Sequence, residues 1–400
     1  MSFLFCCLYG IERDLYHSDL AVIIMVKNEA GVIVQTLEPF VTAGVDCFFV
    51  YDTGSQDGTQ NIIRNYFEKK NKKHAYLIEE PFVDFATSRN RCLDLAEELF
   101  PHVHFFLMID AEWYMHGIDE LLHFCALQKN YIQEGTVGGC YAIRLLTAQD
   151  GIDNYATRLF RNGKNARYSG VVHEAVQQAT SGFLPYSTYF EYRPAQNGIN
   201  KSRERFMRDY YLLKNYLEKN PSDERTLFYL AQTCQFLDRW EEAIEYYKKR
   251  AELGAVSEER YLALYRIGCA IEYILYGNHD FMETSHTPYD MINYYLAAHT
   301  MLPHRIEPLV RLALYYIHLQ QYPVAYLFAL RATQLPYPLH DTLFVEKKLY
   351  DYVRYDLLGQ CALYVGEYEI GKKAVLAALE QNPDASHLHY NLSLYQQLLQ

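Results

Sequence analysis

Four short apolar runs within the first 110 residues constrain the fold more than any other feature of the sequence. Segments with helical spacing of apolar residues separate the runs, at 32–40, 59–67 and 85–99. Uninterrupted apolar runs of this length are typical of parallel strands that are covered on both faces. The alternating order predicts an open, mostly parallel α/β sheet with right-handed crossovers. The runs are AVIIMV (21–26), DCFFVYD (46–52), AYLIE (75–79) and HFFLMID (104–110).

Polar residues follow each predicted strand at its carboxyl end. In open parallel sheets, ligands bind outside the carboxyl ends of the strands. Polar groups after four successive strands therefore predict a pocket at this edge. They are Lys27, Asn28 and Glu29 after the first strand, residues 52–59 after the second, Asp84 after the third, and Asp110 and Glu112 after the fourth.

The two acids after the fourth strand predict a cation site. Asp110 and Glu112 are two residues apart, so in an extended chain their side chains point to the same side. Two adjacent carboxylates repel each other unless a cation lies between them, and oxygen ligands favour Mg²⁺ or Mn²⁺. The alternative is a solvated strand end with two independent surface acids.

The second strand leads into the turn DTGSQDGT (52–59). Gly54 and Gly58 allow a tight turn, while Asp52 and Asp57 supply acceptors for ribose hydroxyls or base edges. The alternative is an ordinary turn with a helix cap. The chain has neither GxGxxG after its first strand nor GxxxxGK[ST] anywhere, so neither a dinucleotide fingerprint nor a P-loop is predicted.

The composition excludes several classes of protein. The chain has 37 Lys and Arg against 49 Asp and Glu, which argues against nucleic-acid binding because that binding depends on neutralising phosphates. Nine cysteines without a CxxC pair favour a reducing compartment. The opening MSFLFCCLYG is a poor signal peptide, and no run approaches the ~18 apolar residues of a membrane span. We expect a cytoplasmic protein without a transmembrane segment, in which residues 1–18 form a packed tail or, alternatively, residues 3–9 contact a membrane surface.

Six motifs together resemble family-two glycosyltransferases of the GT-A fold, in the bacterial-type subgroup that carries a helical-repeat domain behind the catalytic domain. The resemblance covers nearly the whole chain from about residue 19. It implies a GT-A domain, which is Rossmann-like, with the sheet predicted above. The motifs are MVKNE (25–29), VYDTGSQDGT (50–59), FVDFATSRN (82–90), MIDAE (108–112), TRLFRN (157–162) and YSGVVHE (168–174).

The resemblance implies inverting transfer of a sugar from a nucleotide-sugar, first of all a UDP-sugar, to a hydroxyl or other nucleophile on a glycan, protein or peptide. Asp110 and Glu112 would hold Mn²⁺ or Mg²⁺ against the donor diphosphate and so offset the charge of the leaving group. The other donor contacts would come from Asn28, Glu29 and Asp52 around the nucleoside, and from Asp84 and Arg89. Alternatively, Arg89 is a structural partner of Asp84, and Asn28 only caps a helix that begins near Glu29.

Inversion needs a general base opposite the leaving group. The late HE element of the family corresponds to His173 and Glu174, with Glu174 expected as the base and His173 as a metal or diphosphate ligand. The alternative is an internal, structural His–Glu pair. Arg158 and Arg161 are expected to neutralise phosphate on the acceptor side. The chain departs from the family pattern, Asp-x-Asp followed by Glu, at Glu112 and Trp113, and Trp113 offers a flat face for a sugar ring or base or else fills the core.

Beyond residue 196 the pattern changes to helical periodicity. The segments 230–243, 312–325 and 358–371 align without gaps, with Leu first, an aromatic ten positions on and a small residue thirteen positions on. This spacing predicts tetratricopeptide-like helix pairs. We therefore expect a GT-A domain over 19–195 and an all-α helical-repeat domain over 196–400, with a surface loop at 277–288.

The helical array has two alternative roles. It either binds an extended peptide or another domain, which would suit a protein acceptor, or it supports the catalytic domain or forms a homodimer. A competing hypothesis for the whole chain is an inactive glycosyltransferase-like protein that acts as a helical-repeat interaction module. The altered DAEW string at 110–113 favours this alternative, and the retention of the other polar motifs opposes it.

Overall fold

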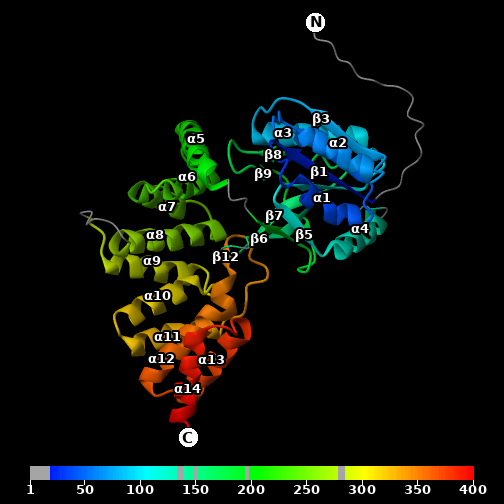
Figure 1. Cartoon of the computed structure of the whole chain (residues 1–400). Coiled ribbons are helices and arrows are strands. Elements are labelled where there is room, and N and C mark those ends of the chain that lie inside the picture. The colour runs from blue at the N-terminus through cyan, green and yellow to red at the C-terminus, as the bar shows by residue number, and fades with distance from the viewer. Residues whose placement is uncertain (1–18, 133–137, 148, 150, 194–197, 278–283) are drawn as a thin grey trace, which may run out of the picture. The chain divides into compact units, whose positions relative to one another are not determined.

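The structure is a computed structural model that describes residues 19–132, 138–147, 149, 151–193, 198–277 and 284–400. The predicted N-terminal tail over 1–18 lies outside the described residues. The chain forms two compact units (Figure 1). Unit 1 consists of the described parts of Met1–Leu145, with Ala156–Gly170 and Glu174–Arg193. Unit 2 consists of the described parts of Leu146–Tyr155, Val171–His173 and Pro194–Gln400.

The first half of unit 1 confirms the predicted alternation of strands and helices. Its four strands run in the order β3-β2-β1-β4, and each neighbouring pair is parallel. The predicted boundaries hold within about two residues. The elements are β1 (Leu20–Val26), α1 (Ile33–Thr42), β2 (Cys47–Asp52), α2 (Thr59–Lys69), β3 (His74–Glu79), α3 (Phe85–Leu99) and β4 (Phe105–Ile109).

Both faces of this parallel sheet are covered, because alternate residues of each strand enter different clusters. In β1, Val22 and Ile24 pack with Phe40 of α1, whereas Ile23 packs with Cys92 of α3 on the other face. This explains why β1 is an apolar run without polar interruption. Burial of both faces fixes the strand register, because a slip by one residue would exchange the two faces.

The rest of the sheet corrects the expectation of a mostly parallel sheet. The full order is β3-β2-β1-β4-β7-β6-β11-β5, where β7 is antiparallel to β4 and β11 is antiparallel to β5. The sheet is therefore mixed, because β4 pairs with β1 on one side in parallel and with β7 on the other side antiparallel. The further elements are β5 (Trp113–His116), α4 (Ile118–Ile132), β6 (Cys140–Thr147), β7 (Ile152–Arg161), β10 (Gly182–Phe183) and β11 (Tyr189–Tyr192), with a separate ribbon of β8 (Tyr168–Ser169) and β9 (Ala175–Val176).

Unit 2 confirms the predicted helix pairs, since each aligned segment begins in one helix and ends in the next. The small residues at the ends of these segments let the helices approach closely. A Cβ built on Gly371, for example, would lie 2.0 Å from the hydroxyl of Tyr395. The helices are α5 (Gly198–Lys219), α6 (Glu224–Phe236), α7 (Trp240–Glu252), α8 (Glu258–Tyr276), α9 (Pro288–Met301), α10 (Glu307–His318), α11 (Tyr322–Thr333), α12 (Arg354–Val365), α13 (Tyr368–Gln381) and α14 (Ser386–Leu398).

Two connections of unit 2 bear on the sequence predictions. Within the predicted loop at 277–288, residues 278–283 lie outside the described residues, and Thr287 caps α9 through a capping box with Asp290. The connection between α11 and α12 contains β12 (Val345–Glu346) and the π-helix η1 (Leu349–Val353). The sequence pattern did not predict either of these two elements.

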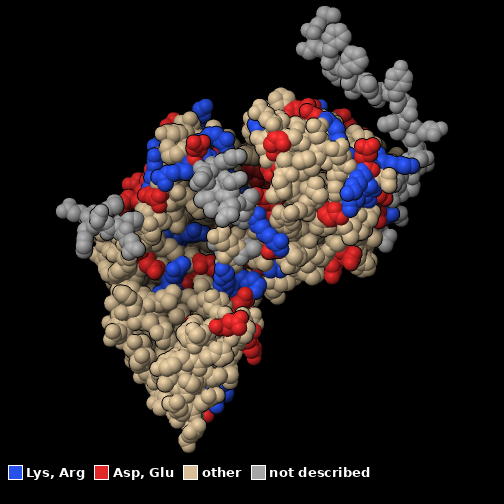
Figure 2. Space-filling view, viewed as in Figure 1, with Lys and Arg blue, Asp and Glu red and all other residues tan. Residues whose placement is uncertain are grey.

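Charged side chains are unevenly distributed on the face shown in Figure 2. Acidic and basic side chains are interspersed over unit 1, whereas the end of unit 2 around α11 to α14 is mostly uncharged on this face. The sequence of α14 contains no Asp, Glu, Lys or Arg. The exposed polar surface of α14 therefore comes from uncharged side chains and histidines.

Candidate functional site

A buried arginine links two of the predicted site acids in unit 1. The Arg89 side chain, in α3, is only 5% exposed. Its Nη2 donates to Asp110 Oδ1 at 2.7 Å, and its Nε donates to Glu174 Oε1 at 2.6 Å. Asp110 directly follows β4, and Glu174 directly precedes β9. The fold thus brings together three residues that the sequence predicted for one site, and Arg89 pairs with these two acids and not with Asp84.

A second arginine completes the cluster from the antiparallel side of the sheet. Arg158 of β7 donates from Nη2 to Asp110 Oδ2 at 2.8 Å, so both carboxylate oxygens of Asp110 accept from guanidinium groups. The guanidinium of Arg158 also lies 4.7 Å from the ring centroid of Trp113. Trp113 is 8% exposed and packs against Phe190. Trp113 therefore fills the core and offers no open face for a sugar ring.

Tyr168 of β8 is a member of the cluster that the sequence analysis missed. The guanidinium of Arg89 lies 5.6 Å from its ring centroid, and that of Arg158 lies 6.0 Å away. Asn90 holds the tyrosine in place, because its side chain donates to the carbonyl of Tyr168 at 2.9 Å and accepts from its N–H at 2.8 Å. The only sequence signal was the presence of Asn90 and Tyr168 at the ends of two recognised motifs.

The charges in the cluster determine the protonation of its members. Burial alone would raise the pKa of Asp110, but the charges of Arg158 and Arg89 outweigh burial and lower it below the ordinary value. Burial raises the pKa of the Tyr168 hydroxyl. At neutral pH the cluster thus contains an ionised Asp110 between two guanidinium cations, beside a neutral phenol.

Several polar atoms of the cluster are not satisfied by the protein. Nη1 of Arg89, Nη1 of Arg158 and Oη of Tyr168 are buried and have no hydrogen-bond partner among the described residues. Folded proteins rarely leave buried donors unpaired. Three such donors in the cluster around Asp110 therefore indicate room in the hydrogen-bond network for a further acceptor, such as water or an anionic ligand.

The geometry that the sequence analysis assumed for Asp110 and Glu112 is wrong. The two residues lie in a turn between β4 and β5, where the Trp113 N–H donates to the Asp110 carbonyl at 3.4 Å. Glu112 has a φ of +66°, in the left-handed region. Their side chains therefore do not follow the alternation of an extended strand. The short connection between two sheet strands imposes the turn.

The loops after β1 and β2 hold each other through side-chain contacts to backbone. Asn28 has a φ of +60°, and its Oδ1 accepts from the Gln56 N–H at 2.7 Å. The Glu29 N–H donates to Thr59 Oγ1 at 2.9 Å. Since α1 begins at Ile33, Asn28 does not cap that helix. Asn28 and Glu29 lie at the carboxyl edge of the sheet, as predicted, and there they shape the loop.

The two acids of the DTGSQDGT turn differ in their remaining hydrogen-bonding capacity. Asp57 accepts from the backbone N–H groups of Ala30 and Thr59, so internal contacts use both of its oxygens. Asp52 is fully buried, and its Oδ1 accepts from the N–H groups of Gly54 and Ser55. Its Oδ2 is buried without a partner among the described residues. Asp52 is thus the acid of this turn with an acceptor to spare.

Asp84 has a structural role in the fold. It is the N-cap of α3, where it accepts from the Thr87 N–H at 2.7 Å and from the Thr87 hydroxyl at 2.8 Å. An aspartate in this position satisfies an N–H group that the helix leaves free. Its predicted contact with a nucleotide stays a prediction.

His173 belongs to unit 2, although Glu174 belongs to unit 1. The imidazole stacks on Tyr229 of α6 with 4.2 Å between ring centroids, and the His173 carbonyl accepts from Arg225 Nη2 at 3.0 Å. Burial, together with the charges of Arg225 and Arg205, lowers the pKa of His173 to about 4. The ring is therefore neutral at physiological pH. Its predicted metal or diphosphate ligation stays a prediction.

The described residues do not form a metal site from protein ligands alone. No group of three or more His, Cys, Asp or Glu among them is placed to hold a metal ion. Mg²⁺ at phosphate sites commonly takes only one or two protein carboxylates, and phosphate oxygens and water supply the rest. A metal at Asp110 and Glu112 would therefore need a bound diphosphate to complete its ligand set.

A pocket of about 440 Å³ lies at the opposite end of β4 from Asp110. Arg161 lies in this pocket, and Arg158 lies in the buried cluster. The sequence analysis had expected both arginines of the TRLFRN motif on the acceptor side. In the structure they lie in different places. The pocket is lined by Pro101, His102, Val103, His104, Arg161, Asn162 and Gly163.

Comparison with known proteins gives a distant similarity to glycosyltransferases. No protein-family model matches the chain. The SPbeta prophage-derived glycosyltransferase SunS of Bacillus subtilis (strain 168) is 25% identical over 241 residues, which cover 56% of this chain and 51% of that protein. The glycosyltransferase SunS of Bacillus phage SPbeta gives the same figures. The chain thus spans about half the length of the curated relatives that it matches.

Solved structures match part of the chain at low sequence identity. The MamA protein has 17% identity and a TM-score of 0.34, and the match covers 48% of this chain and 90% of MamA. YrrB, described as a TPR protein with an unusual peptide-binding site, has 17% identity and a TM-score of 0.35, with 46% of this chain and 82% of YrrB covered.

Among the described residues, no helix has the length and apolar character that crossing a membrane requires.

Proposed function

We propose that this protein is an inverting glycosyltransferase of the GT-A class that transfers a sugar from a nucleotide-sugar, first of all a UDP-sugar, to a nucleophile on a glycan, protein or peptide. The observation that carries the proposal is the buried cluster of Arg89, Asp110, Glu174 and Arg158 at the carboxyl end of β4. The distant similarity to glycosyltransferases supports the same reaction class.

In this proposal the two arginines recognise the anionic part of the donor. Each guanidinium uses one nitrogen on Asp110 and keeps a buried Nη1 without a partner among the described residues. Guanidinium donors suit phosphate oxygens, because their planar geometry allows paired hydrogen bonds. Asp52, with its spare Oδ2, would accept a hydrogen bond from the nucleoside.

Asp110 and Glu112 would hold Mn²⁺ or Mg²⁺ together with the donor diphosphate. The bound metal would supply charge stabilisation for the departing nucleoside diphosphate. Each oxygen of Asp110 accepts one guanidinium bond and has a further lone pair, so Asp110 would bind the metal while the Nη1 group of each arginine donates to phosphate. Glu174 is the proposed general base, and its bond to Arg89 fixes the orientation of its carboxylate.

One observation favours the competing hypothesis of an inactive, transferase-like interaction protein. Both oxygens of Asp110 are already bonded within the protein, as in a purely structural ion-pair cluster. The two hypotheses differ in a simple way, because only the enzyme needs to bind a nucleotide-sugar.

Thermal unfolding with a panel of donors tests the proposal. UDP-, GDP-, CMP- and dTDP-sugars are each added with and without Mn²⁺ to the wild type and to Asp110→Asn. A ligand that binds only the folded protein raises the melting temperature. At a ligand concentration of 100 times Kd, the free energy of unfolding increases by about 2.7 kcal/mol. We expect one nucleotide class to stabilise the wild type with Mn²⁺ and not Asp110→Asn. If no donor stabilises the wild type, the interaction module is the better account.

A further inference from the structure

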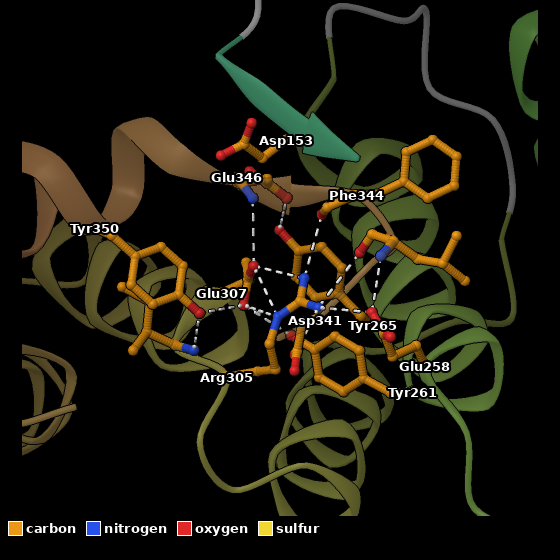
Figure 3. Close-up of polar contacts among 12 residues, drawn as sticks. Asp153, Glu258, Tyr261, Tyr265, Arg305, Glu307, Asp341, Phe344, Glu346 and Tyr350 are labelled. Atoms are coloured by element: carbon orange, nitrogen blue, oxygen red, sulfur yellow. Dashed lines mark hydrogen bonds and ion pairs between the residues drawn. The ribbon is translucent and has the colours of Figure 1, made fainter. Parts of the chain in front are cut away.

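Residues 341–346, with the sequence DTLFVE, form a segment that bends at Leu343 and ends in the short strand β12, and it lies against the helical array of unit 2. The segment contacts the first helices of three successive helix pairs, which are α6, α8 and α10. Figure 3 shows its contacts with side chains of α8, with Glu307 of α10 and with Arg305, which precedes α10. We call this part of the chain the DTLFVE segment.

The array binds the backbone of the DTLFVE segment through two charged side chains. Glu258, at the start of α8, accepts from the Thr342 N–H at 2.8 Å and from the Leu343 N–H at 2.8 Å. Arg305, just before α10, donates to the carbonyls of Leu343 at 3.3 Å and Phe344 at 3.2 Å. Hydrogen bonds to main-chain groups are a general source of affinity in peptide recognition.

Side chains of the segment add a chemical pattern to this recognition. At one end Asp341 pairs with Arg305 at 3.2 Å, and at the other end Glu346 accepts from the Tyr265 hydroxyl at 2.6 Å. Between them, Phe344 lies 6.3 Å from the ring of Phe228, and Val345 is 1% exposed. The site thus accommodates acids at both ends of a short, mainly apolar stretch.

The binding side of the array keeps its charge balance without the segment. Arg305 is fully buried, pairs with the equally buried Glu307 at 2.7 Å and lies 3.8 Å from Glu258. The Tyr261 hydroxyl donates to Glu307 at 3.0 Å. Buried charges are tolerated when they are paired and hydrogen-bonded. Removal of Asp341 therefore leaves Arg305 with two acidic partners.

The other edge of the segment contacts residues of β7 that belong to unit 2. Val345 pairs with Asp153 in an antiparallel ladder, and the Phe344 N–H donates to Asn154 Oδ1 at 2.7 Å. Phe344 has a φ of +46°, which is unfavourable for an aromatic residue. The segment is thus bound on both edges, but one of its residues is strained in the bound conformation.

We propose that α6, α8 and α10, with Arg305, form a binding site for a short peptide with acidic ends and an apolar centre, and that the chain fills this site itself with the DTLFVE segment. A second peptide of the same pattern reaches the site only by displacing the segment. The inference does not depend on glycosyl transfer, and an inactive transferase-like protein would have the same site.

The test uses a fluorescent synthetic peptide, HDTLFVEK, which corresponds to residues 340–347. Thr342→Pro removes the N–H that Glu258 binds and leaves every array residue unchanged. By fluorescence anisotropy, we expect full-length Thr342→Pro to bind the peptide roughly tenfold tighter than the wild type, because the competing segment is weakened. Adding Glu258→Gln should lower that affinity about tenfold, because it removes charge-assisted hydrogen bonds. A folded Thr342→Pro protein that does not bind the peptide overturns the proposal, as does binding that is insensitive to Glu258→Gln.

Hydrogen exchange of the wild type keeps the proposal falsifiable if Thr342→Pro does not fold. A segment that leaves its site by local opening exchanges its amides faster than the helical core does. We expect the amides of Thr342 and Leu343 to exchange faster than that of Ile267, a fully buried residue of α8. Equal protection of the three amides would show that the segment is an integral part of the core, and would overturn the proposal.

Discussion

Removal of the central arginine of the buried cluster tests the electrostatic account of unit 1. Arg89→Met keeps the length of the side chain and removes the cation that bonds Asp110 and Glu174. The Arg89 side chain is 5% exposed, that of Glu174 is 11% exposed and that of Asp110 is 25% exposed, so solvent replaces only part of the lost interaction. Breaking a buried pair of this kind costs about 3–5 kcal/mol. For a unit of this size, that lowers the melting temperature by roughly 6–20 °C.

The chain offers a matched control and a local reporter. Arg91→Met, on the same helix, breaks a pair with Glu80 in which the arginine is 43% exposed, and such a pair contributes only about 0–1 kcal/mol. The chain has two tryptophans, Trp113 in unit 1 and Trp240 in unit 2. In a Trp240→Phe background, tryptophan fluorescence during urea unfolding reports on unit 1 alone.

The pH dependence provides a second, independent result. Because the arginines lower the pKa of Asp110 in the folded state, its contribution to stability is fully present above about pH 4 and disappears as the pH falls through the lowered pKa. The deficit of Arg89→Met relative to the wild type should therefore shrink below about pH 4. A deficit no larger than that of Arg91→Met, or one that is constant down to pH 2, would refute the account.

Three further predictions concern individual residues. Asp84→Ala should lower the stability of unit 1 by about 1 kcal/mol, because the cap of α3 is lost. If capping is the only role of Asp84, donor affinity should not change; urea unfolding measures the stability and donor titration measures the affinity. Gly117→Ala should destabilise by more than about 1 kcal/mol, because Gly117 has a φ of +68° and a Cβ would lie 2.3 Å from the Ser187 carbonyl; Gly163→Ala, at φ +72° with open space, is the control in urea unfolding. The pKa of His173 is lowered to about 4 in the folded state, so the wild type should lose up to about 3 kcal/mol of stability as the pH falls from 6.5 to about 4. His173→Phe should not show this pH-dependent loss, and urea unfolding at several pH values measures the difference.

The sequence was sufficient for the elements whose signal is local. The apolar runs and helical spacing predicted β1 to β4 and their helices, because burial on both faces leaves a direct trace in composition. The strand pattern placed Asp110 at the carboxyl edge of the sheet, and the family resemblance named Arg89 and Glu174 for the same site; the structure brings the three side chains into contact. Their pairing was not predictable, because Arg89 and Glu174 are 85 positions apart and the topology alone brings them together.

The errors occurred where tertiary contacts determine the backbone. Asp110 and Glu112 were expected on an extended chain, but pairing of β5 with β11 forces a turn with a left-handed Glu112. Tyr168 was missed because its position depends on Asn90, 78 positions earlier in the sequence. The DTLFVE segment has no helical or strand periodicity of its own, and its conformation depends on Arg305 and Glu258.

Release of nucleoside diphosphate from a nucleotide-sugar tests the central claim most directly. The wild type, Asp110→Asn and Arg91→Met are each incubated with the donor panel and Mn²⁺, with and without simple glycan and peptide acceptors, and the released nucleotide is measured by chromatography. If the protein is a glycosyltransferase, the wild type and Arg91→Met release nucleoside diphosphate from one class of nucleotide-sugar, and Asp110→Asn does not. Absence of release by folded wild type with every donor and acceptor, or equal release by Asp110→Asn, would contradict the assignment of the buried cluster as a sugar-transfer site.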